Sequence, residues 1–448
     1  MAVTLESPES AGCATEQGEL SSRAAAEAYI GGVCFKLGPP TLIGAELEWL
    51  TVHGECSASG SAAAPRPQLS ALADALGPYA PRSIAPDSPA LALPGGSRVT
   101  LEPGGQIELS SAPYGAAAQL CDRLRDDARS LRELLESRSI RTVSVAADAD
   151  RRPKRLLRLP RYRAMERAFG GIGPFGKLMM CNTAATQVSV DAGADHADVT
   201  ARWSALYAVG PALLAAFACS PALRGAPPGA WASQRMRAWL RLDNTRTRPP
   251  VLDWTDPVAA YGKWALDVPL LCVRRPEGVA APGDGRDEGW FAPPGATFAD
   301  WLSGALDDEV GRRPDIGDLD YHLTTLFPPV RASGHLEVRY IDAQPGEGWT
   351  VPVHVIDALM SSPAVVAEAS SIAAPLAARW VDAARYGLAD PDLRAAAVAL
   401  LRLAAAHTAT DEAARAVESA AERCRRGRTP TEDDVEHGPD ARPPEAAP

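Results

Sequence analysis

Pairs of glutamates occur at short spacings on segments that have the pattern of β-strands. Glu46 and Glu48 lie two residues apart, so both project from one face of the strand expected over residues 41–52. At about 5 Å and an effective dielectric near 20, two such carboxylates repel by roughly 3 kcal/mol. A divalent cation turns this repulsion into binding, and Mg²⁺ shared between carboxylates and substrate phosphates is a common arrangement at nucleotide sites.

A second pair flanks an expected turn in the stretch Leu-Glu-Pro-Gly-Gly-Gln-Ile-Glu-Leu, residues 101–109. The Pro-Gly step predicts a tight turn in which Gly104 takes a positive φ. Residues 99–102 and 106–110 are expected to be short strands, and pairing them as a hairpin brings Glu102 near Glu108. Taken singly, Glu46 and Glu48 are also typical of a solvent-facing strand, and Glu102 of an ordinary turn-flanking acid.

Two later strands supply further polar candidates. Alternation over residues 183–191 places Gln187 and Ser189 on one face, which is equally compatible with exposed positions of an edge strand. In the strand expected at 335–342, Glu337 and Arg339 share a face, and Arg331 lies shortly before them. An Arg beside a Glu is most often a salt bridge, but guanidinium also matches the geometry of a phosphoryl group.

Residues 171–177 satisfy G-x-G-x-x-G and the first part of a P-loop, yet they are not interpreted as a phosphate loop. Leu178 stands where a P-loop requires Ser or Thr, and a helix rather than a strand is expected before the glycines. We interpret this stretch as a helix-to-strand connection.

Composition limits the classes of protein that fit. The chain has 448 residues, 46% of them hydrophobic, and a net charge of −11, which disfavours nucleic acid or an anionic membrane as the main partner. No apolar run reaches the length of a membrane span, and residues 1–20 lack the features of a secretory signal, so a cytoplasmic protein is expected. The eight cysteines are scattered without a C-x-x-C pair, which predicts neither a zinc site nor a disulfide framework.

The pattern of elements predicts an α+β protein. Helices are expected at 21–31, 115–137, 162–169 and 195–218 and through the Ala-rich residues 353–425, with a further strand at 140–146. Residues 54–96 are expected to be a surface excursion with one short helix, 235–250 to be irregular and 274–295 to be a mobile loop. Residues 1–20 and 426–448 are expected to be disordered, on either side of one domain at 21–425.

The order E-x-E, E-P-G-G-Q-x-E, Q-V-x-V-D and R…E-x-R resembles the glutamine synthetase superfamily of carboxylate–amine ligases. It is most similar to plant-type glutamate–cysteine ligases and to the actinobacterial enzymes that make γ-glutamylcysteine for ergothioneine. Further matching segments lie at 179–191, 236–246, 261–269 and 336–345. The resemblance implies a curved, mainly antiparallel sheet of about six strands with helices on its convex side, and metal ions between ATP and glutamate on its concave face.

The resemblance also implies roles for individual residues. It implies metal ligation by Glu46, Glu48, Glu102, Glu108, Gln187 and Glu337, catalysis by Arg331 and Arg339, nucleotide contacts by Arg339 and Gln187, and substrate contacts by Arg237, Ser189 and Arg331. Arg241 stands where the plant sequence has Trp, so the resemblance does not assign the residues of the glutamate pocket in detail.

The activity implied is Mg²⁺- and ATP-dependent ligation of L-glutamate to L-cysteine through a γ-glutamyl phosphate, with residues 274–295 as a candidate lid. A ligase with another amine acceptor, or a non-catalytic protein of the same fold that binds glutamate or nucleotide, remain alternatives. No oligomeric state is predicted.

Overall fold

A single antiparallel sheet runs through the centre of the computed structural model, which describes residues 20, 22–54, 64–250, 255–274, 290–291 and 293–431. Six of its seven strands follow the order β2-β3-β1-β5-β9-β8, and β4 also pairs with β1. Their bounds are β1 Ile43–His53, β2 Arg98–Leu101, β3 Ile107–Ser110, β4 Ile140–Val143, β5 Ala185–Val190, β8 Val330–Ala332 and β9 Leu336–Asp342. The predicted antiparallel sheet is therefore confirmed, and it has seven strands where about six were expected.

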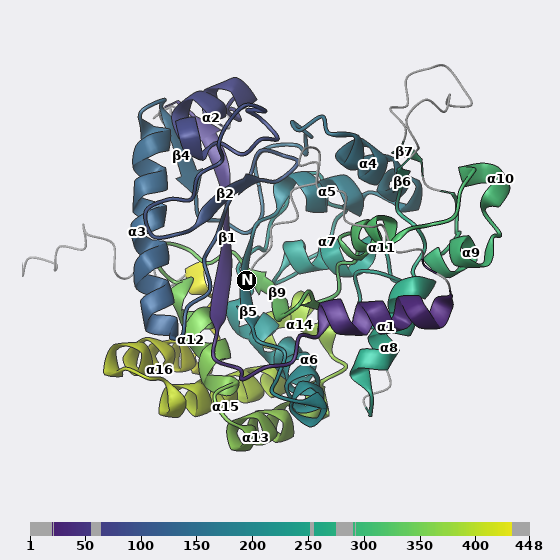
Figure 1. Ribbon diagram of the computed structural model, residues 1–448. Helices are drawn as coiled ribbons and strands as arrows, with labels where there is room; N and C mark the ends of the chain where they lie inside the picture. The colour runs from purple at the N-terminus through teal and green to yellow at the C-terminus, as the bar shows by residue number, and fades with distance from the viewer. Residues whose placement is uncertain are drawn as a thin grey trace, which may run out of the picture.

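The two faces of the sheet differ in character because residues alternate along β1. Ala45, Leu47 and Trp49 are buried, whereas Glu46 and Glu48 on the other face are only half-buried. Several helices contact the strands of this sheet. Helix α3 (Ala117–Glu136) meets β1 and β4, α6 (His196–Phe217) and α7 (Gln234–Leu242) meet β9, and α12 (Thr350–Leu359) meets β5. Figure 1 shows α3 running alongside β1.

Further helices form a second layer behind α6 and α12 (Figure 1). These are α13 (Pro363–Ala373), α14 (Trp380–Tyr386), α15 (Pro391–His407) and α16 (Asp411–Arg425), with short 3₁₀ turns at Ala374–Leu376 and Gly387–Ala389. One hydrophobic cluster includes residues from Ala26 to Cys424, so helices from both ends of the described chain share a core with the sheet.

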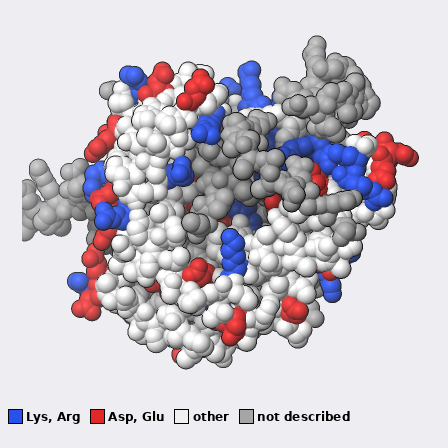
Figure 2. Space-filling view, in the orientation of Figure 1, with Lys and Arg blue, Asp and Glu red and all other residues white. Residues whose placement is uncertain are grey.

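A smaller group of helices lies to the right of the strands in the view of Figure 1, where α3 lies to their left. It comprises α1 (Arg23–Cys34), α8 (Pro257–Asp267), α9 (Phe298–Ser303), α10 (Asp307–Val310) and α11 (Ile316–Leu323), near the hairpin of β6 (Val273–Arg274) and β7 (Trp290–Phe291). Near α10, Figure 2 shows acidic side chains next to basic ones, and Arg313 Nε lies 3.2 Å from Asp307 Oδ1. Both signs of charge therefore occur at this end of the molecule.

The hairpin turn forms where it was predicted but uses a different glycine. Gly105, not Gly104, has the positive φ, at 84°, and its N–H donates to Glu102 O over 2.8 Å. Gly104 is constrained by packing instead, because a Cβ there would lie 2.3 Å from the carbonyl oxygen of Cys181. Gln106 Nε2 also donates to the carbonyls of Met180 and Thr183, at 3.3 and 2.9 Å. The turn is thus fastened to the end of α5 (Phe175–Asn182).

Most expected elements appear within a few residues of their predicted bounds, but three expectations were wrong. Residues 171–177 connect two helices, α4 (Pro160–Ile172) and α5, rather than a helix and a strand, because α5 begins directly after Pro174. The stretch expected to be irregular at 235–250 starts inside α7 (Gln234–Leu242), whose N-cap Ser233 accepts from Met236 N. The strand expected at 140–146 ends at Val143.

Other expectations fall wholly or partly outside the described residues. Within 54–96 the structure has α2 (Leu69–Leu76) and a 3₁₀ turn at Gly77–Tyr79. Most of the loop expected at 274–295 and most of the two predicted disordered ends are not described. The single domain at 21–425 stays a prediction.

No single helix in the described ranges is long and apolar enough to cross a membrane, and only the pair 350–359 and 363–376, bent by 108°, meets that test together.

Candidate active site

The strand register places most of the predicted site residues on one face of the sheet. Glu48 on β1 lies opposite Glu108 on β3, Glu46 lies opposite Gln187 on β5, and Ser189 lies opposite Glu337 on β9. Arg331 on β8 completes the series opposite Glu337. Directly opposed residues of antiparallel strands point to the same side. Side chains from five strands therefore share the face turned away from α3 and α12, and Arg339 joins them two residues after Glu337.

The carboxylates of β1 and the hairpin lie in surroundings that disfavour their charged form. Burial, reinforced by the negative charge of Glu102, raises the pKa values of Glu48 and Glu108 to about 8. Burial also raises the pKa of Glu46 well above its ordinary range and that of Glu102 to a lesser extent. Among the described residues, none of the four forms an ion pair. A cation bound beside these four glutamates would therefore be stabilised by their carboxylates.

Hydrogen bonds from neutral groups hold these acids in place. Glu48 Oε2 accepts from Ala185 N over 2.8 Å, and Glu108 Oε1 accepts from Thr100 Oγ1 over 2.5 Å. Gln187 Nε2 bridges β1 by donating to Glu46 Oε2 at 3.0 Å and Glu48 Oε1 at 3.1 Å. The sheet itself thus positions these acids. The groups that donate to them are uncharged, so they do not neutralise a carboxylate charge.

Glu337 is more deeply buried than the acids of β1, with 1% of its surface exposed, and it has two arginine partners. Arg331 Nε and Arg339 Nη1 both lie 2.7 Å from its Oε2, and Arg331 Nη2 lies 3.3 Å from its Oε1. Burial alone would raise the pKa of Glu337, but the charges of Arg331 and Arg339 outweigh it and lower the pKa to about 2. Glu337 therefore stays ionised and holds both guanidinium groups against the sheet.

Gln187 stands at an irregularity in the sheet. The pairing of β5 with β9 shifts register between Thr186 and Val188, so Gln187 has no partner residue on β9. Its side chain is buried, and with Nε2 bonded to the two glutamates its Oε1 accepts no hydrogen bond from the described residues. A buried amide oxygen without a donor, beside two carboxylates, has the chemistry of a ligand for a hard cation.

The structure does not bring Arg237 to the acidic face. Its Nη1 donates to Pro227 O over 2.7 Å and its Nη2 to Pro228 O over 3.1 Å, and its guanidinium lies over the ring of Trp231. Arg235, on the other side of the same helix, is the arginine that reaches the sheet. Its Nη2 donates to Arg339 O over 2.7 Å, and its positive charge lowers the pKa of Glu48.

Arg235 was not among the site residues predicted from the sequence, although a signal for it was present. Two residues of a helix point about 200° apart, so only one of Arg235 and Arg237 can face the sheet. Because residues 235–250 were expected to be irregular, the sequence did not show which of the two arginines faces the sheet. Arg161 of α4 was missed as well; its charge lowers the pKa of Glu102.

Comparison with known proteins agrees with this geometry. The model of the glutamate–cysteine ligase family 2 matches residues 42–442, nearly the whole described chain. The chain belongs to this family. Glutamate–cysteine ligase EgtA of Mycolicibacterium smegmatis is 35% identical over 90% of this chain and 88% of its own length. EgtA of Mycobacterium tuberculosis is 34% identical over 92% and 89%. The chloroplastic glutamate–cysteine ligase of Medicago truncatula is 32% identical over 56% of this chain and 48% of its own.

A solved structure confirms the fold class of this family member. The crystal structure of a glutamate–cysteine ligase from Francisella tularensis, determined in complex with AMP, matches with a TM-score of 0.50 over 89% of this chain and 85% of that chain. At 14% identity the likeness concerns the fold alone. The predicted glutamine synthetase-like α+β fold is thereby confirmed.

The acids of this family 2 ligase do not form a ready-made metal cage. Within the described ranges, no three His, Cys, Asp or Glu side chains are grouped so that they could hold a metal ion. Mg²⁺ seldom needs such a group, because it keeps several waters and binds one or two carboxylates together with substrate phosphates. Unpaired carboxylates and the free oxygen of Gln187 are oxygen donors of this kind. The donor set thus fits Mg²⁺ that arrives with a nucleotide.

Proposed function

We propose that this protein uses ATP to join the γ-carboxylate of L-glutamate to the amine of L-cysteine, forming γ-glutamylcysteine, ADP and phosphate for ergothioneine synthesis. The observation that carries the proposal is the single face on which four carboxylates, none of them in an ion pair with a described residue, lie beside Glu337 and its two arginines. The family membership and the similarity to the two EgtA enzymes support the choice of substrates.

The reaction needs no covalent nucleophile from the protein. A γ-carboxylate oxygen of glutamate attacks the γ-phosphorus of ATP, the bond to the β,γ-bridging oxygen breaks, and ADP leaves. The amine nitrogen of cysteine then attacks the acyl carbon, the carbon–oxygen bond to phosphate breaks with its electron pair going to phosphate, and the nitrogen releases a proton. The protein contributes by positioning the reactants and neutralising charge.

The two halves of the face divide this work. Mg²⁺ would be held by oxygens chosen from Glu46, Glu48, Glu102, Glu108, Gln187 and Glu337; when bound, it neutralises phosphate charge and orients the transferred group. Arg331 and Arg339, held by Glu337, stabilise charge that grows on the phosphoryl oxygens. Ser189 contacts substrate on the same face, whereas Arg237 is engaged with backbone carbonyls and is no longer our choice for the substrate carboxylate.

The test is product formation by the purified full-length chain with MgATP, glutamate and cysteine. We expect γ-glutamylcysteine by mass spectrometry and one ADP per peptide bond, with little ADP when glutamate is omitted. Replacing cysteine by 2-aminobutyrate and by other amines defines the acceptor. Faster turnover with another amine would identify a different ligase, and nucleotide binding without ADP formation would identify a non-catalytic protein.

A further inference from the structure

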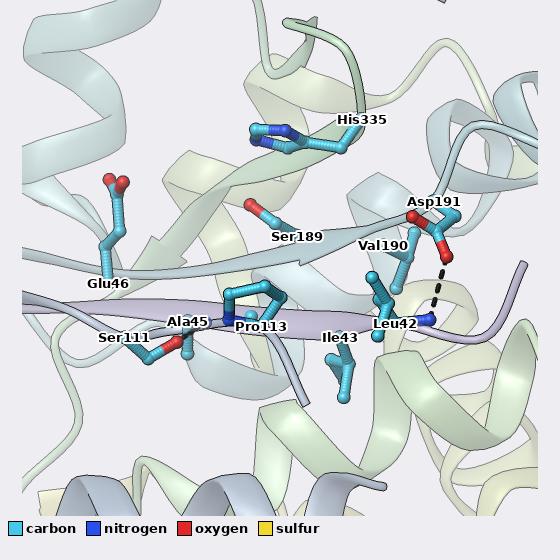
Figure 3. A pocket seen from close by; sticks show the side chains of 11 residues that line it. Leu42, Ile43, Ala45, Glu46, Ser111, Pro113, Ser189, Val190, Asp191 and His335 are labelled. Atoms are coloured by element: carbon cyan, nitrogen blue, oxygen red, sulfur yellow. Dashed lines mark hydrogen bonds between the residues drawn. The ribbon is translucent and has the colours of Figure 1, made fainter. Parts of the chain in front are cut away.

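The hollow at the start of β1 is lined by acidic and uncharged groups. Figure 3 shows Glu46, Ser189 and His335 on the same side of the strands, and no Lys or Arg of the described chain lines the space around them. Stabilising the charge of a transferred phosphoryl group therefore falls to the guanidinium groups of Arg331 and Arg339. The way in which these two groups are held is consequently important for the proposed reaction.

The two arginines are not held equally. Arg331 is fixed by two hydrogen bonds to Glu337, from Nε at 2.7 Å and from Nη2 at 3.3 Å. Arg339 donates to Glu337 through Nη1, at 2.7 Å, and its buried Nε has no hydrogen-bond partner among the described residues. Two parallel hydrogen bonds define the direction of a guanidinium group, whereas one leaves it able to turn. Arg339 therefore needs a second contact to fix its orientation.

Trp239 of α7 supplies this second contact. The guanidinium carbon of Arg339 lies 5.5 Å from the centroid of the indole ring, and that of Arg235 lies 5.4 Å from the same ring. Both distances are within the reach of a cation–π attraction, which is stronger for cations removed from water. Arg235 and Trp239 are four residues apart and share one side of α7. Because Arg235 Nη2 also donates to the carbonyl oxygen of Arg339 over 2.7 Å, this side of the helix contacts both the main chain and the side chain of Arg339.

The indole ring of Trp239 is itself held in place. Its Nε1 donates to the carbonyl oxygen of Phe327 over 2.8 Å, and the ring of Phe327 packs edge-on against it at a centroid distance of 6.1 Å. Ser233, the N-cap of α7, donates to Asp342 Oδ1 on β9 over 2.8 Å, so the helix is fastened to the strand that carries Arg339. Trp239 is buried as well. The ring is therefore a fixed surface beside the guanidinium of Arg339.

We propose that Trp239 is a positioning residue of the reaction, whose ring keeps the guanidinium of Arg339 turned toward the phosphoryl oxygens. Nη2 of Arg339 makes no hydrogen bond to a described residue, so this group is the one that the ring would present to an oxygen of the phosphoryl group. Arg331, bound twice to Glu337, needs no such support. Trp239 touches no reacting atom and acts through Arg339. This inference rests on the proposed ligase activity.

The test compares Trp239→Leu with Trp239→Phe. Both variants lose the indole N–H and have a smaller side chain, but only Leu lacks an aromatic face. We expect Trp239→Leu to lower kcat for γ-glutamylcysteine formation about tenfold and Trp239→Phe to stay within about threefold of the unmodified protein. The KM values for glutamate and cysteine should change by less than about twofold in both. Equal losses of kcat in the two variants would assign the effect to packing or to the lost N–H and overturn the proposal.

A double-mutant cycle tests whether Trp239 acts through Arg339. Arg339→Lys keeps the positive charge but has no flat guanidinium to lie over the ring. Adding Trp239→Leu to it should lower kcat by less than about twofold, because the interaction is already lost. Adding Trp239→Leu to Arg331→Lys should still cost about tenfold. A tenfold loss in both backgrounds would show that Trp239 does not act through Arg339 and would overturn the proposal.

Trp301 of α9 is the matched control. Its Nε1 also donates to a carbonyl oxygen, that of Arg312, over 2.8 Å, and the Arg312 guanidinium lies 5.0 Å from its ring, but α9 packs against α1 and α8. Trp301→Leu should lower the thermal stability and leave kcat of the folded protein unchanged; a tenfold loss there would contradict the special role of Trp239. If Trp239→Leu does not fold, Trp239→Met, which fills irregular space without a ring, replaces it. Absence of γ-glutamylcysteine with the unmodified protein would instead overturn the ligase activity itself.

Discussion

Glu108 and Glu337 are buried on the same face of one sheet, yet their pKa values shift in opposite directions. Glu108 belongs to the half formed by β1 and the hairpin, where burial and neighbouring acids raise its pKa to about 8. Glu337 belongs to the half formed by β8 and β9, where Arg331 and Arg339 lower its pKa to about 2. Charge partners, and not depth of burial, therefore decide which of these acids stay ionised.

Each half then has a chemical preference that the other lacks. The β1 half carries carboxylates that gain stability from protons or metal cations. The β8–β9 half has its acid already neutralised by two guanidinium groups, whose further N–H groups remain suited to phosphate oxygens. A magnesium nucleotide would satisfy both halves together.

Glu108→Gln should cause the largest loss. It keeps the size and part of the hydrogen bonding of the side chain but removes the charge that a cation needs. We expect kcat for γ-glutamylcysteine formation to fall by about 10³-fold, with thermal unfolding showing an intact fold. Activity equal to that of the unmodified protein would remove Glu108 from the reaction.

Glu337→Gln should lower stability as well as activity, because it leaves two guanidinium groups packed together without their carboxylate. Breaking such a buried pair costs about 3 kcal/mol, measurable as a lower free energy of unfolding in urea. The control is Glu422→Gln on α16: Glu422 also has a pKa lowered to about 2, by hydrogen bonds from Arg425 and Arg426, but it is exposed. We expect no measurable change there. Equal effects of the two substitutions would contradict the importance of burial.

The free energy of unfolding should fall as the pH rises, because of the raised pKa values of Glu48 and Glu108. Between the ordinary pKa of 4.5 and the folded-state value of about 8, the folded protein retains protons on Glu48 and Glu108 that the unfolded chain has lost. Their contribution is complete below pH 4.5 and is lost as the pH rises toward 8, by at most about 1.4 kcal/mol per pH unit for each group.

Urea unfolding between pH 5 and 8, without metal or nucleotide, measures this slope. The double variant Glu48→Gln/Glu108→Gln should decline less steeply with pH than the unmodified protein. Identical slopes would show that these two acids are already ionised in the folded state.

Thr100→Val should have the smallest effect. It removes the hydrogen bond that lowers the pKa of Glu108, and its loss is worth about 1 kcal/mol. We expect a reduction of about fivefold in kcat/KM for MgATP. Thr100→Ser keeps the hydroxyl and serves as the control. If both variants lose activity equally, packing rather than the hydrogen bond is responsible.

Local sequence patterns identified the strands but not their partners. The spacing of Glu46 and Glu48 correctly places both on one face, since side chains alternate along a strand. The same pattern contains nothing to show that β1 pairs with β5, more than 130 residues later, or that β5 in turn pairs with β9. That arrangement was available only through the resemblance to a family, and it is what brings Glu337 into the site.

The errors have physical explanations of the same kind. Gly104 and Gly105 are equivalent by type, and only the contact with Cys181 shows which glycine serves packing and which serves the turn. Arg235 and Arg237 are equally plausible in an irregular segment, and only a helix separates their directions. Roles of individual residues as ligands for metal or substrate remain predictions.

The fastening of the hairpin turn to α5 has a mechanical consequence. Gln106 and the close approach at Gly104 prevent the turn from moving unless the end of the helix moves with it. Glu102 and Glu108, at the two ends of the turn, must therefore shift together when α5 is displaced. A substitution at Met180 or Cys181, on a helix that carries none of the proposed ligands, should consequently appear in assays as weakened affinity for MgATP in a protein that is still folded.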